Sequence, residues 1–140
     1  MKMEQADQEL EALRLKKAGK LMNQVLLPAS IVKLHTAEEY KNLTEKYPET
    51  IIVIDFTAVW CGPCKIYAPI FESLQSEYYK DFIFAKVDVD ENRTTAMQYQ
   101  ISGVPTTLFV KKGNEINRGV GALNYDMLKQ YLEELKASGN

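Results

Sequence analysis

Cysteine and histidine are scarce in this chain of 140 residues, which has two cysteines and a single histidine, His35. Two cysteines are too few for a disulfide-rich secreted scaffold. Together with one histidine they also cannot provide the four ligands of a structural zinc site within one chain, so we expect no metal. At this length a single domain buries a sizeable core without disulfide staples. The two cysteines are therefore candidates for chemistry, and His35 is expected to be structural.

The sequence also lacks a charge excess and long apolar runs. Seventeen basic residues against nineteen acidic ones leave a formal net charge of −2, which does not indicate nucleic-acid binding. The longest apolar runs, such as residues 51–54, are far shorter than the roughly 18 residues that cross a membrane. Four acidic side chains within residues 4–11 are untypical of a secretory signal or a mitochondrial transit peptide. We expect a cytoplasmic protein with no membrane or nucleic-acid partner.

The first 30 residues differ in composition from the rest. Residues 4–26 are rich in good helix formers and carry apolar side chains at helical spacing, which predicts an amphipathic helix. Pro28 interrupts this pattern, so residues 1–29 are interpreted as a helical extension and residues 30–140 as the domain. The extension either packs on a monomeric domain or contacts a partner or a second copy.

Apolar runs, helix caps and helical spacing predict the elements of the domain. We expect strands at 31–34, 51–56 and 82–87, a hairpin of 106–111 with 115–119, and a helix ending before Gly139. Helices are expected at 37–46 behind a Thr36 capping box, at 63–80 with a kink at Pro69, and at 91–99 capped by Asp90. Tyr78, Tyr79 and Phe82 are assigned to the core. The order β-α-β-α-β-α-β-β-α predicts an α/β fold with a central mixed sheet, helices on both faces and an antiparallel hairpin at one edge.

The segment Trp60-Cys61-Gly62-Pro63-Cys64 stands between a predicted strand and a predicted helix. Residues three apart in a first helical turn have Cα atoms about 5 Å apart, which suits a disulfide that opens and closes. The helix N-terminus favours the Cys61 thiolate, Pro63 fits the first helical position, and Gly62 leaves room for a partner's backbone. Two buried core thiols or half of an intermolecular metal site are the alternatives. A C-x-x-C beside a βαβ pattern in a cytosolic chain favours redox chemistry.

The run D-F-T-A-V-W-C-G-P-C-K, followed by Ala68-Pro69 and then by V-D-V-D, G-V-P-T and G-V-G-A, closely resembles the thioredoxin family over residues 31–137. The resemblance implies a thioredoxin-like fold and a protein disulfide reductase without a cofactor. It further implies disulfide-containing substrate proteins and a thioredoxin reductase as electron donor. Two features depart from the family: the N-terminal extension, and Thr57 where many members carry an aromatic residue.

The resemblance also assigns roles. Cys61 would be the nucleophile, Cys64 the resolving cysteine, Asp55 a proton-transfer group tuned by Lys86, and Pro105 a cis-proline. From the residues alone, Asp55 is equally a solvent-exposed residue at a strand end, and Lys86 an exposed strand lysine. The residues alone do not decide between these alternatives.

A docking surface around Cys61 is implied by the same resemblance, with the Val104 backbone pairing with an extended substrate segment. Its expected members are Trp60, Val104, Val120, Gly121 and Ala122. Trp60 is alternatively a core aromatic, and Gly121 part of a plain turn.

Two other functions remain open. The first is a docking module in which the fold and residues 1–28 recruit a partner, and the second is a disulfide isomerase or oxidase. The Gly62-Pro63 dipeptide and the absence of an export signal favour the reductase. No glycine-rich phosphate loop is present, so the electrons must come from a separate protein.

Overall fold

The structure is a computed structural model, and it describes residues 8–10 and 27–139. The predicted order of elements in the domain is confirmed. Residues 8–10 are helical, whereas the rest of the helix predicted at 4–26 lies outside the described residues. The elements of the domain are β1 (Val32–Lys33), α2 (Ala37–Lys46), β2 (Ile52–Thr57), α3 (Gly62–Tyr78), β3 (Ile83–Asp88), α4 (Arg93–Gln98), β4 (Thr106–Lys111), β5 (Asn114–Val120) and α5 (Tyr125–Ala137).

The five strands form one mixed sheet in the order β1-β3-β2-β4-β5. Strands β1, β3 and β2 run parallel, β4 is antiparallel to β2, and β5 is antiparallel to β4. The predicted hairpin therefore forms one edge of the sheet. Because β2 is central and covered on both sides, it needs apolar residues at successive positions, which explains the run Ile51–Ile54.

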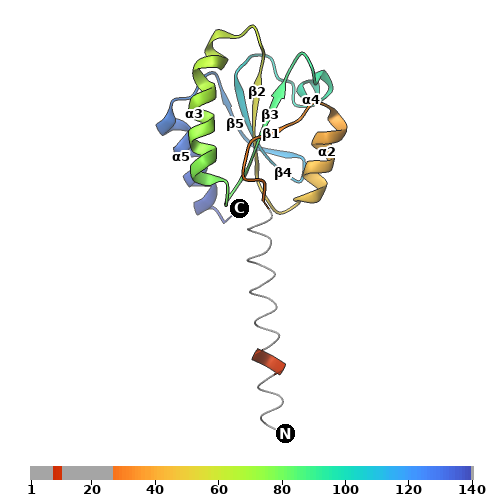
Figure 1. Cartoon of the computed structure of the whole chain (residues 1–140), viewed down its shortest axis with the longest axis vertical. Coiled ribbons are helices and arrows are strands. Elements are labelled where there is room, and N and C mark those ends of the chain that lie inside the picture. Colours follow the sequence, from red (N-terminus) through yellow and green to blue (C-terminus); the bar gives the residue numbers. More distant parts are fainter. Residues whose placement is uncertain (1–7, 11–26, 140) are drawn as a thin grey trace.

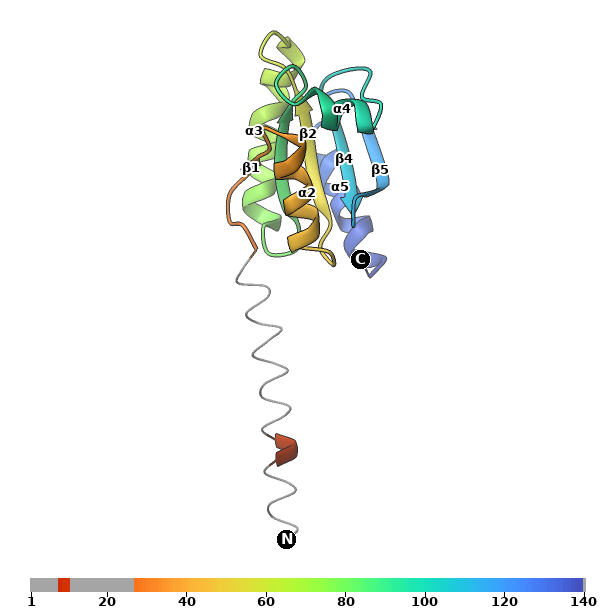
Figure 2. The same ribbon diagram turned by 90° about the vertical axis from the view of Figure 1, so that its right-hand side faces the viewer.

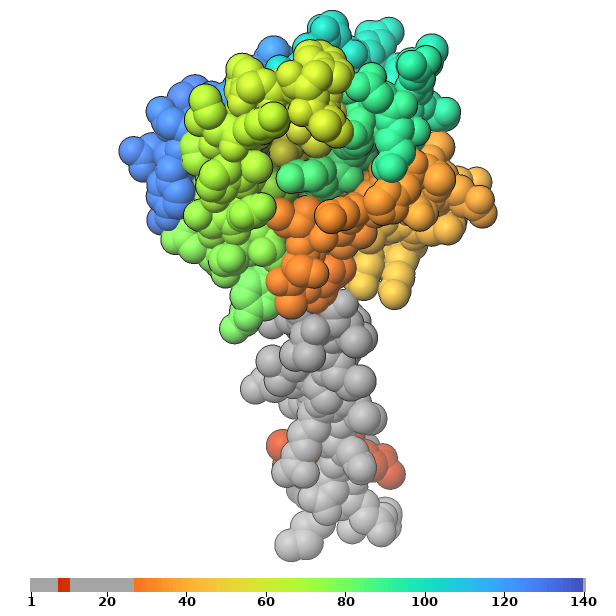
Figure 3. All heavy atoms as spheres, turned by 45° about the horizontal axis from the view of Figure 1, so that its top comes forward, coloured from red at the N-terminus to blue at the C-terminus, as the bar shows by residue number. Residues whose placement is uncertain are grey.

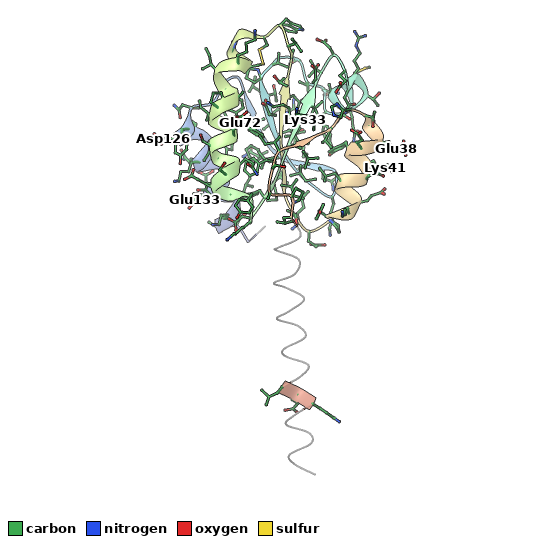
Figure 4. All side chains as sticks on the ribbon, in the orientation of Figure 1. Lys33, Glu38, Lys41, Glu72, Asp126 and Glu133 are labelled. Carbon is green, nitrogen blue, oxygen red and sulfur yellow. A yellow bond between two sulfur atoms is a disulfide. The ribbon has the colours of Figure 1, made fainter. Side chains whose placement is uncertain are left out.

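Two layers of helices cover the sheet (Figures 1 and 2). Helices α3 and α5 pack on one side, here called the α3 face, where Val53 of β2 contributes to the core. Helices α2 and α4 pack on the other side, the α2 face, which receives Ile52 and Ile54. Charged side chains such as Glu72 on α3 and Glu38 on α2, both labelled in Figure 4, are exposed. Successive residues of β2 thus pack into the helical layers on opposite faces of the sheet.

The cap of the helix predicted at 91–99 is corrected by the structure. Helix α4 begins only at Arg93, and its cap is Asn92, whose Oδ1 accepts the N–H of Thr95 at 3.3 Å. Asp90 lies in the preceding turn, where its own N–H donates to Asp88 Oδ1 at 2.9 Å. Residues 91 and 92, which were predicted to start the helix, belong to this turn and the cap, so α4 is shorter than predicted. The Thr36 cap of α2 is confirmed.

Three smaller expectations also change. The hairpin turn has two residues, because Lys112 and Gly113 both have positive φ and Asn114 already pairs in β5. Helix α3 starts one residue earlier than predicted and ends at Tyr78, two residues earlier than predicted, whereas the kink at Pro69, which lies inside the helix, stays a prediction. Tyr79 is only half-buried and is not part of the core cluster that contains Tyr78 and Phe82.

Candidate active site

A disulfide joins Cys61 and Cys64 where β2 passes into α3. Their Cα atoms are 5.3 Å apart, close to the spacing expected from helix geometry. Cys61 is the N-cap of α3, and its Sγ accepts the N–H of Cys64 at 3.2 Å. The first turn of α3 contains no acidic side chain, so the positive end of the helix dipole is not neutralised locally. This environment favours a thiolate at Cys61 when the disulfide is open.

Gly62 and Pro63 form the exposed first turn between the two cysteines. Pro63 is the second helical residue and not the first, because α3 already begins at Gly62. Its missing N–H is still among those that an α-helix leaves free. A Cβ placed on Gly62 would meet nothing within 4 Å, so the space in front of the disulfide is open.

The loop before β4 and the end of β5 complete the surroundings of the disulfide. The Val104–Pro105 peptide bond is cis, as the resemblance implied. The Val104 carbonyl oxygen is 3.7 Å from Cys61 Sγ. The Gly121 N–H donates to the Pro105 carbonyl at 2.8 Å, and Gly121 adopts a φ of +91° that favours glycine. These contacts bring the Val104–Pro105 and Val120–Ala122 segments together beside Cys61.

Exposed apolar side chains surround the disulfide, although both cysteines are themselves buried. Val59, Trp60 and Val120 are 79%, 71% and 71% exposed. Trp60 is therefore not a core aromatic, and its Nε1–H donates to Asp90 Oδ2 at 2.8 Å. We call Val59, Trp60, Val104 and Val120 the apolar rim. Ala122 is also exposed, in the turn that follows β5.

Asp55 lies in the interior of the α3 face and is only 1% exposed, which excludes the solvent-exposed alternative. Its partner in β3 is Lys86, which is half-buried, and its partner in β4 is Thr107. Burial raises the pKa of the Asp55 carboxyl from 3.8 to about 6, and the opposing effect of the Lys86 charge is smaller. Asp55 Oδ1 has no hydrogen-bond partner. The carboxyl group therefore titrates close to neutral pH.

Sequence reasoning missed two residues beside Asp55. Tyr67 of α3 and Thr107 of β4 are fully buried, and their hydroxyl oxygens are 2.6 Å apart. We call Lys86, Asp55, Thr107 and Tyr67 the polar row. Tyr67 lies one helical turn after Cys64 on the buried side of α3, which places the row next to the disulfide turn.

A cavity of about 320 Å³ opens beside the row, where β1, β3 and the β2–α3 loop meet. Lys86 and Thr57 line it, and the three segments come together on the face shown in Figure 3. The short Thr57 side chain helps to leave this space free. His35 lies at its edge with Nδ1 2.7 Å from Glu91 Oε1, in keeping with a structural role.

A C-x-x-C disulfide at the start of a helix, next to a cis-proline on a mixed sheet, defines the thioredoxin-fold class. The Thioredoxin family model matches residues 31–134. Mouse mitochondrial thioredoxin is 40% identical over 87 residues, which is 62% of this chain but only 52%, about half, of the mouse protein. Thioredoxin-1 of Caenorhabditis elegans is 37% identical over 71% of this chain and 85% of its own length.

Solved structures agree with these sequence matches. The crystal structure of Schistosoma mansoni thioredoxin has a TM-score of 0.70 and 36% identity, covering 76% of this chain and 95% of that one. Fasciola hepatica thioredoxin gives a TM-score of 0.70 and 38% identity over 74% of this chain and 98% of its own. The chain belongs to the thioredoxin family.

The described residues contain neither a membrane span nor a metal site. No helix within residues 8–10 and 27–139 is long and apolar enough to cross a membrane. Within the same ranges, His, Cys, Asp and Glu side chains do not gather in groups of three or more that would hold a metal ion.

Proposed function

We propose that this chain is a protein disulfide reductase that cycles between a Cys61/Cys64 dithiol and the disulfide seen in the structure. The observation that carries the proposal is the position of this disulfide at the N-terminus of α3. Closing a loop of this length stabilises a fold by only about 2 kcal/mol, less than a long-range bridge, so redox exchange is the better use of the pair.

The reaction proceeds in two exchanges. The Cys61 thiolate attacks one sulfur of a substrate disulfide and forms a mixed disulfide, while the other substrate sulfur leaves as a thiolate. Cys64 then loses its proton and attacks Cys61 Sγ, which releases the second substrate sulfur. Two electrons have then passed from the cysteine pair to the substrate, and the Cys61–Cys64 disulfide remains.

Asp55 is the proton acceptor for Cys64 in this scheme. A carboxyl with a pKa of about 6 is about nine-tenths ionised at pH 7, so it is available as a base and gives up its proton readily afterwards. Lys86, its partner in β3, keeps that pKa from rising further. The cavity lined by Lys86 gives the proton a path to solvent.

Substrates bind across the apolar rim in this proposal. The backbone of Val104, beside Cys61, pairs with an extended substrate segment, while Trp60, Val120, Gly121 and Ala122 contact its side chains. The open space at Gly62 lets the substrate backbone approach the sulfur. The substrates are disulfide-containing proteins, and a thioredoxin reductase returns the electrons.

The cytoplasm is the compartment we propose, because glutathione and thioredoxin systems keep dithiols reduced there. The protein acts there as an electron carrier between its reductase and its substrates. Residues 30–140 form the catalytic domain in this proposal, supported by the family match that begins at residue 31, and residues 1–29 are an appended helix. A chain starting at Ser30 should keep full reductase activity.

Single-cysteine variants test the proposed function on a small disulfide-bonded protein substrate. Cys61→Ser should abolish reduction, because the attacking thiolate is gone. Cys64→Ser should accumulate a covalent mixed disulfide, which a non-reducing gel detects. Full activity in Cys61→Ser would refute the reductase and favour the docking module.

Equilibration with a glutathione buffer separates a reductase from an isomerase or oxidase. We expect a midpoint potential near that of the family's reductases, about −270 mV. A midpoint at or above about −180 mV would identify an isomerase or an oxidant instead.

A further inference from the structure

The hydroxyl groups of Tyr67 and Thr107 leave one hydrogen without an obvious acceptor. Two hydroxyls carry two hydrogens, and the 2.6 Å contact between their oxygens uses only one of them. Both side chains are fully buried, so water at the surface does not accept the other. A buried donor is costly unless it finds a partner. The spare hydrogen therefore needs an acceptor inside the core.

The group toward which this hydrogen can be directed is the carboxylate of Asp55, although neither hydroxyl forms a hydrogen bond with Asp55 Oδ1 in the structure. Among the described residues, two buried side-chain oxygens lack a hydrogen-bond partner, Asp55 Oδ1 and Thr95 Oγ1. Thr95 belongs to α4, which packs on the opposite face of the sheet. Asp55 is directly opposite Thr107 in the β2–β4 pairing, and such side chains point to the same face. Burial is the main cause of the raised pKa of Tyr67, and the Asp55 charge raises it further, so the two groups lie within each other's field.

The two sides of Asp55 differ in their surroundings. On the β3 side are Lys86 and, two residues further along the strand, Asp88, and both line the cavity that admits solvent. On the β4 side Thr107 is sealed from solvent. Helix α3 contributes Tyr67 to the polar row and carries Cys64 one helical turn before it. A hydroxyl dipole acts strongly in such a dry place, because little water screens it.

We propose that Tyr67 and Thr107 are positioning residues that turn their spare O–H toward Asp55 Oδ1, stabilise its ionised form, and so set the lower pH limit at which Cys64 is deprotonated. A hydroxyl dipole directed at a carboxylate favours the charged state of that carboxylate even without a hydrogen bond, so the pair opposes the effect of burial. Lys86 does the same from the solvent side. The kinetic part of this inference rests on the proposed function, whereas the effect on Asp55 does not.

The direct test is the titration of the Asp55 carboxyl carbon by ¹³C NMR in the disulfide form. Thr107→Val keeps the side-chain shape and removes the hydroxyl, and combining it with Tyr67→Phe removes both. In the double variant the midpoint should rise by about one pH unit, which is a tenfold change in the ionisation constant.

Disulfide reduction should follow the same shift. If the Asp55 midpoint moves from about 6 to about 7, the ionised fraction at pH 6 falls about fivefold, and the resolving step slows accordingly. At pH 8 the double variant and the wild type should react at nearly equal rates. A general loss of folding would instead lower the rate at every pH.

Two matched variants separate positioning from packing. Thr107→Ser keeps the hydroxyl and should retain the wild-type midpoint. Tyr40→Phe removes a comparable buried hydroxyl, the one bonded to Tyr99 on the α2 face, and should leave the Asp55 midpoint unchanged.

An unchanged Asp55 midpoint in the folded double variant would overturn the inference, as would an equal rise in Tyr40→Phe. A raised midpoint with an unshifted rate profile would overturn the link to Cys64. A wild-type protein that reduces no disulfides would refute the proposed function, while the titration would still decide what the hydroxyl pair does to Asp55.

Discussion

The two faces of the sheet are built from the same strands but differ in polarity. On the α2 face, β2, β3 and β4 contribute aliphatic side chains and phenylalanine, such as Ile54 and Leu108, and one neutral polar side chain, Thr106. On the α3 face, at the end near the disulfide, the three strands contribute Lys86, Asp55 and Thr107. Because side chains alternate along a strand, a charge lies one residue from Ile54 without entering the apolar face. One face of the sheet is thus almost entirely apolar, and the other carries the polar groups to which we assign the proposed proton transfer.

The buried hydroxyl pairs show the same contrast. On the α2 face the hydroxyls of Tyr40 and Tyr99 bond to each other, and Tyr99 also donates to the Gly113 carbonyl at 2.6 Å. Both hydrogens of that pair therefore have acceptors. On the α3 face the Tyr67–Thr107 pair has one hydrogen left beside a carboxylate. We call the Tyr40–Tyr99 pair closed, because both of its hydrogens are bonded, and the Tyr67–Thr107 pair open. A closed pair stabilises the fold, whereas the unbonded hydrogen of an open pair can orient toward the neighbouring charge.

The largest effect is expected when a polar side chain enters the apolar face. Ile54→Asn removes a fully buried aliphatic side chain and leaves an amide without partners. We expect a loss of about 4 kcal/mol in unfolding free energy, measured by urea denaturation at pH 7. A loss below about 1 kcal/mol would show that the α2 face tolerates polarity and would remove the contrast.

The same new residue one position further along should have the opposite effect. Asp55 has a pKa near 6 in the folded protein against 3.8 unfolded, so the fold binds its proton more tightly and loses stability as pH rises through 6. Asn does not ionise. Asp55→Asn should therefore gain about 3 kcal/mol above pH 7 and little below pH 4, measured by denaturation across this range.

An exposed acid provides the control for this prediction. Asp126→Asn on α5 should change stability by no more than about 0.5 kcal/mol at any of these pH values. A gain in stability that is the same at every pH in Asp55→Asn would mean that the ionised carboxylate does not destabilise the fold. Another interaction would then offset the cost of burying its charge.

A smaller loss is expected from the closed hydroxyl pair. Tyr40→Phe leaves Tyr99 with its bond to Gly113 but removes one buried hydrogen bond. We expect about 1 kcal/mol less stability, equal at pH 5 and pH 8, because no charged group lies in that pair. A pH-dependent loss would show that both faces couple hydroxyls to charge, which would end the distinction between closed and open pairs.

The sequence was sufficient wherever the signal is local. The continuous apolar run in 51–56, the Thr36 cap and the position of Cys61 before a helix depend on neighbouring residues, and the structure confirms them. The incorrect prediction of Asp90 as a helix cap shows the limit of local rules, because Asn92 is equally suited to cap a helix and is the residue that caps α4. The contact with Trp60, 30 residues away in the chain, accounts for Asp90 instead.

The hydroxyl pair could not be predicted for a similar reason. Thr107 is β-branched and typical of any strand, and Tyr67 is typical of a core aromatic on a helix. Their contact spans 40 residues and depends on the register of β2 with β4 and on how α3 lies across the sheet. The one sequence signal that could have indicated the pair is that Tyr67 and Thr107 place hydroxyl groups at core positions where packing alone favours aliphatic side chains.

The smallest effect is expected at the apolar rim, outside both faces. Asp90→Ala removes the acceptor of the Trp60 indole N–H, but water competes for that bond because Trp60 is 71% exposed. Stability should change by no more than about 0.5 kcal/mol, whereas kcat/KM for a protein disulfide should fall about two- to fivefold as the indole loses its fixed orientation.

The fluorescence of Trp60, the single tryptophan, reports that change directly. Asp90→Asn keeps an oxygen acceptor and should retain most of the activity. If Asp90→Ala instead lowered kcat/KM by a factor of about 100 or more, the loss would exceed what one exposed hydrogen bond supplies, and Asp90 would have to be placed in the reaction itself. The apolar rim would then contribute to the reaction and not only to substrate binding. The contrast between a structural α2 face and a chemical α3 face would then have to be extended to the surface around the disulfide.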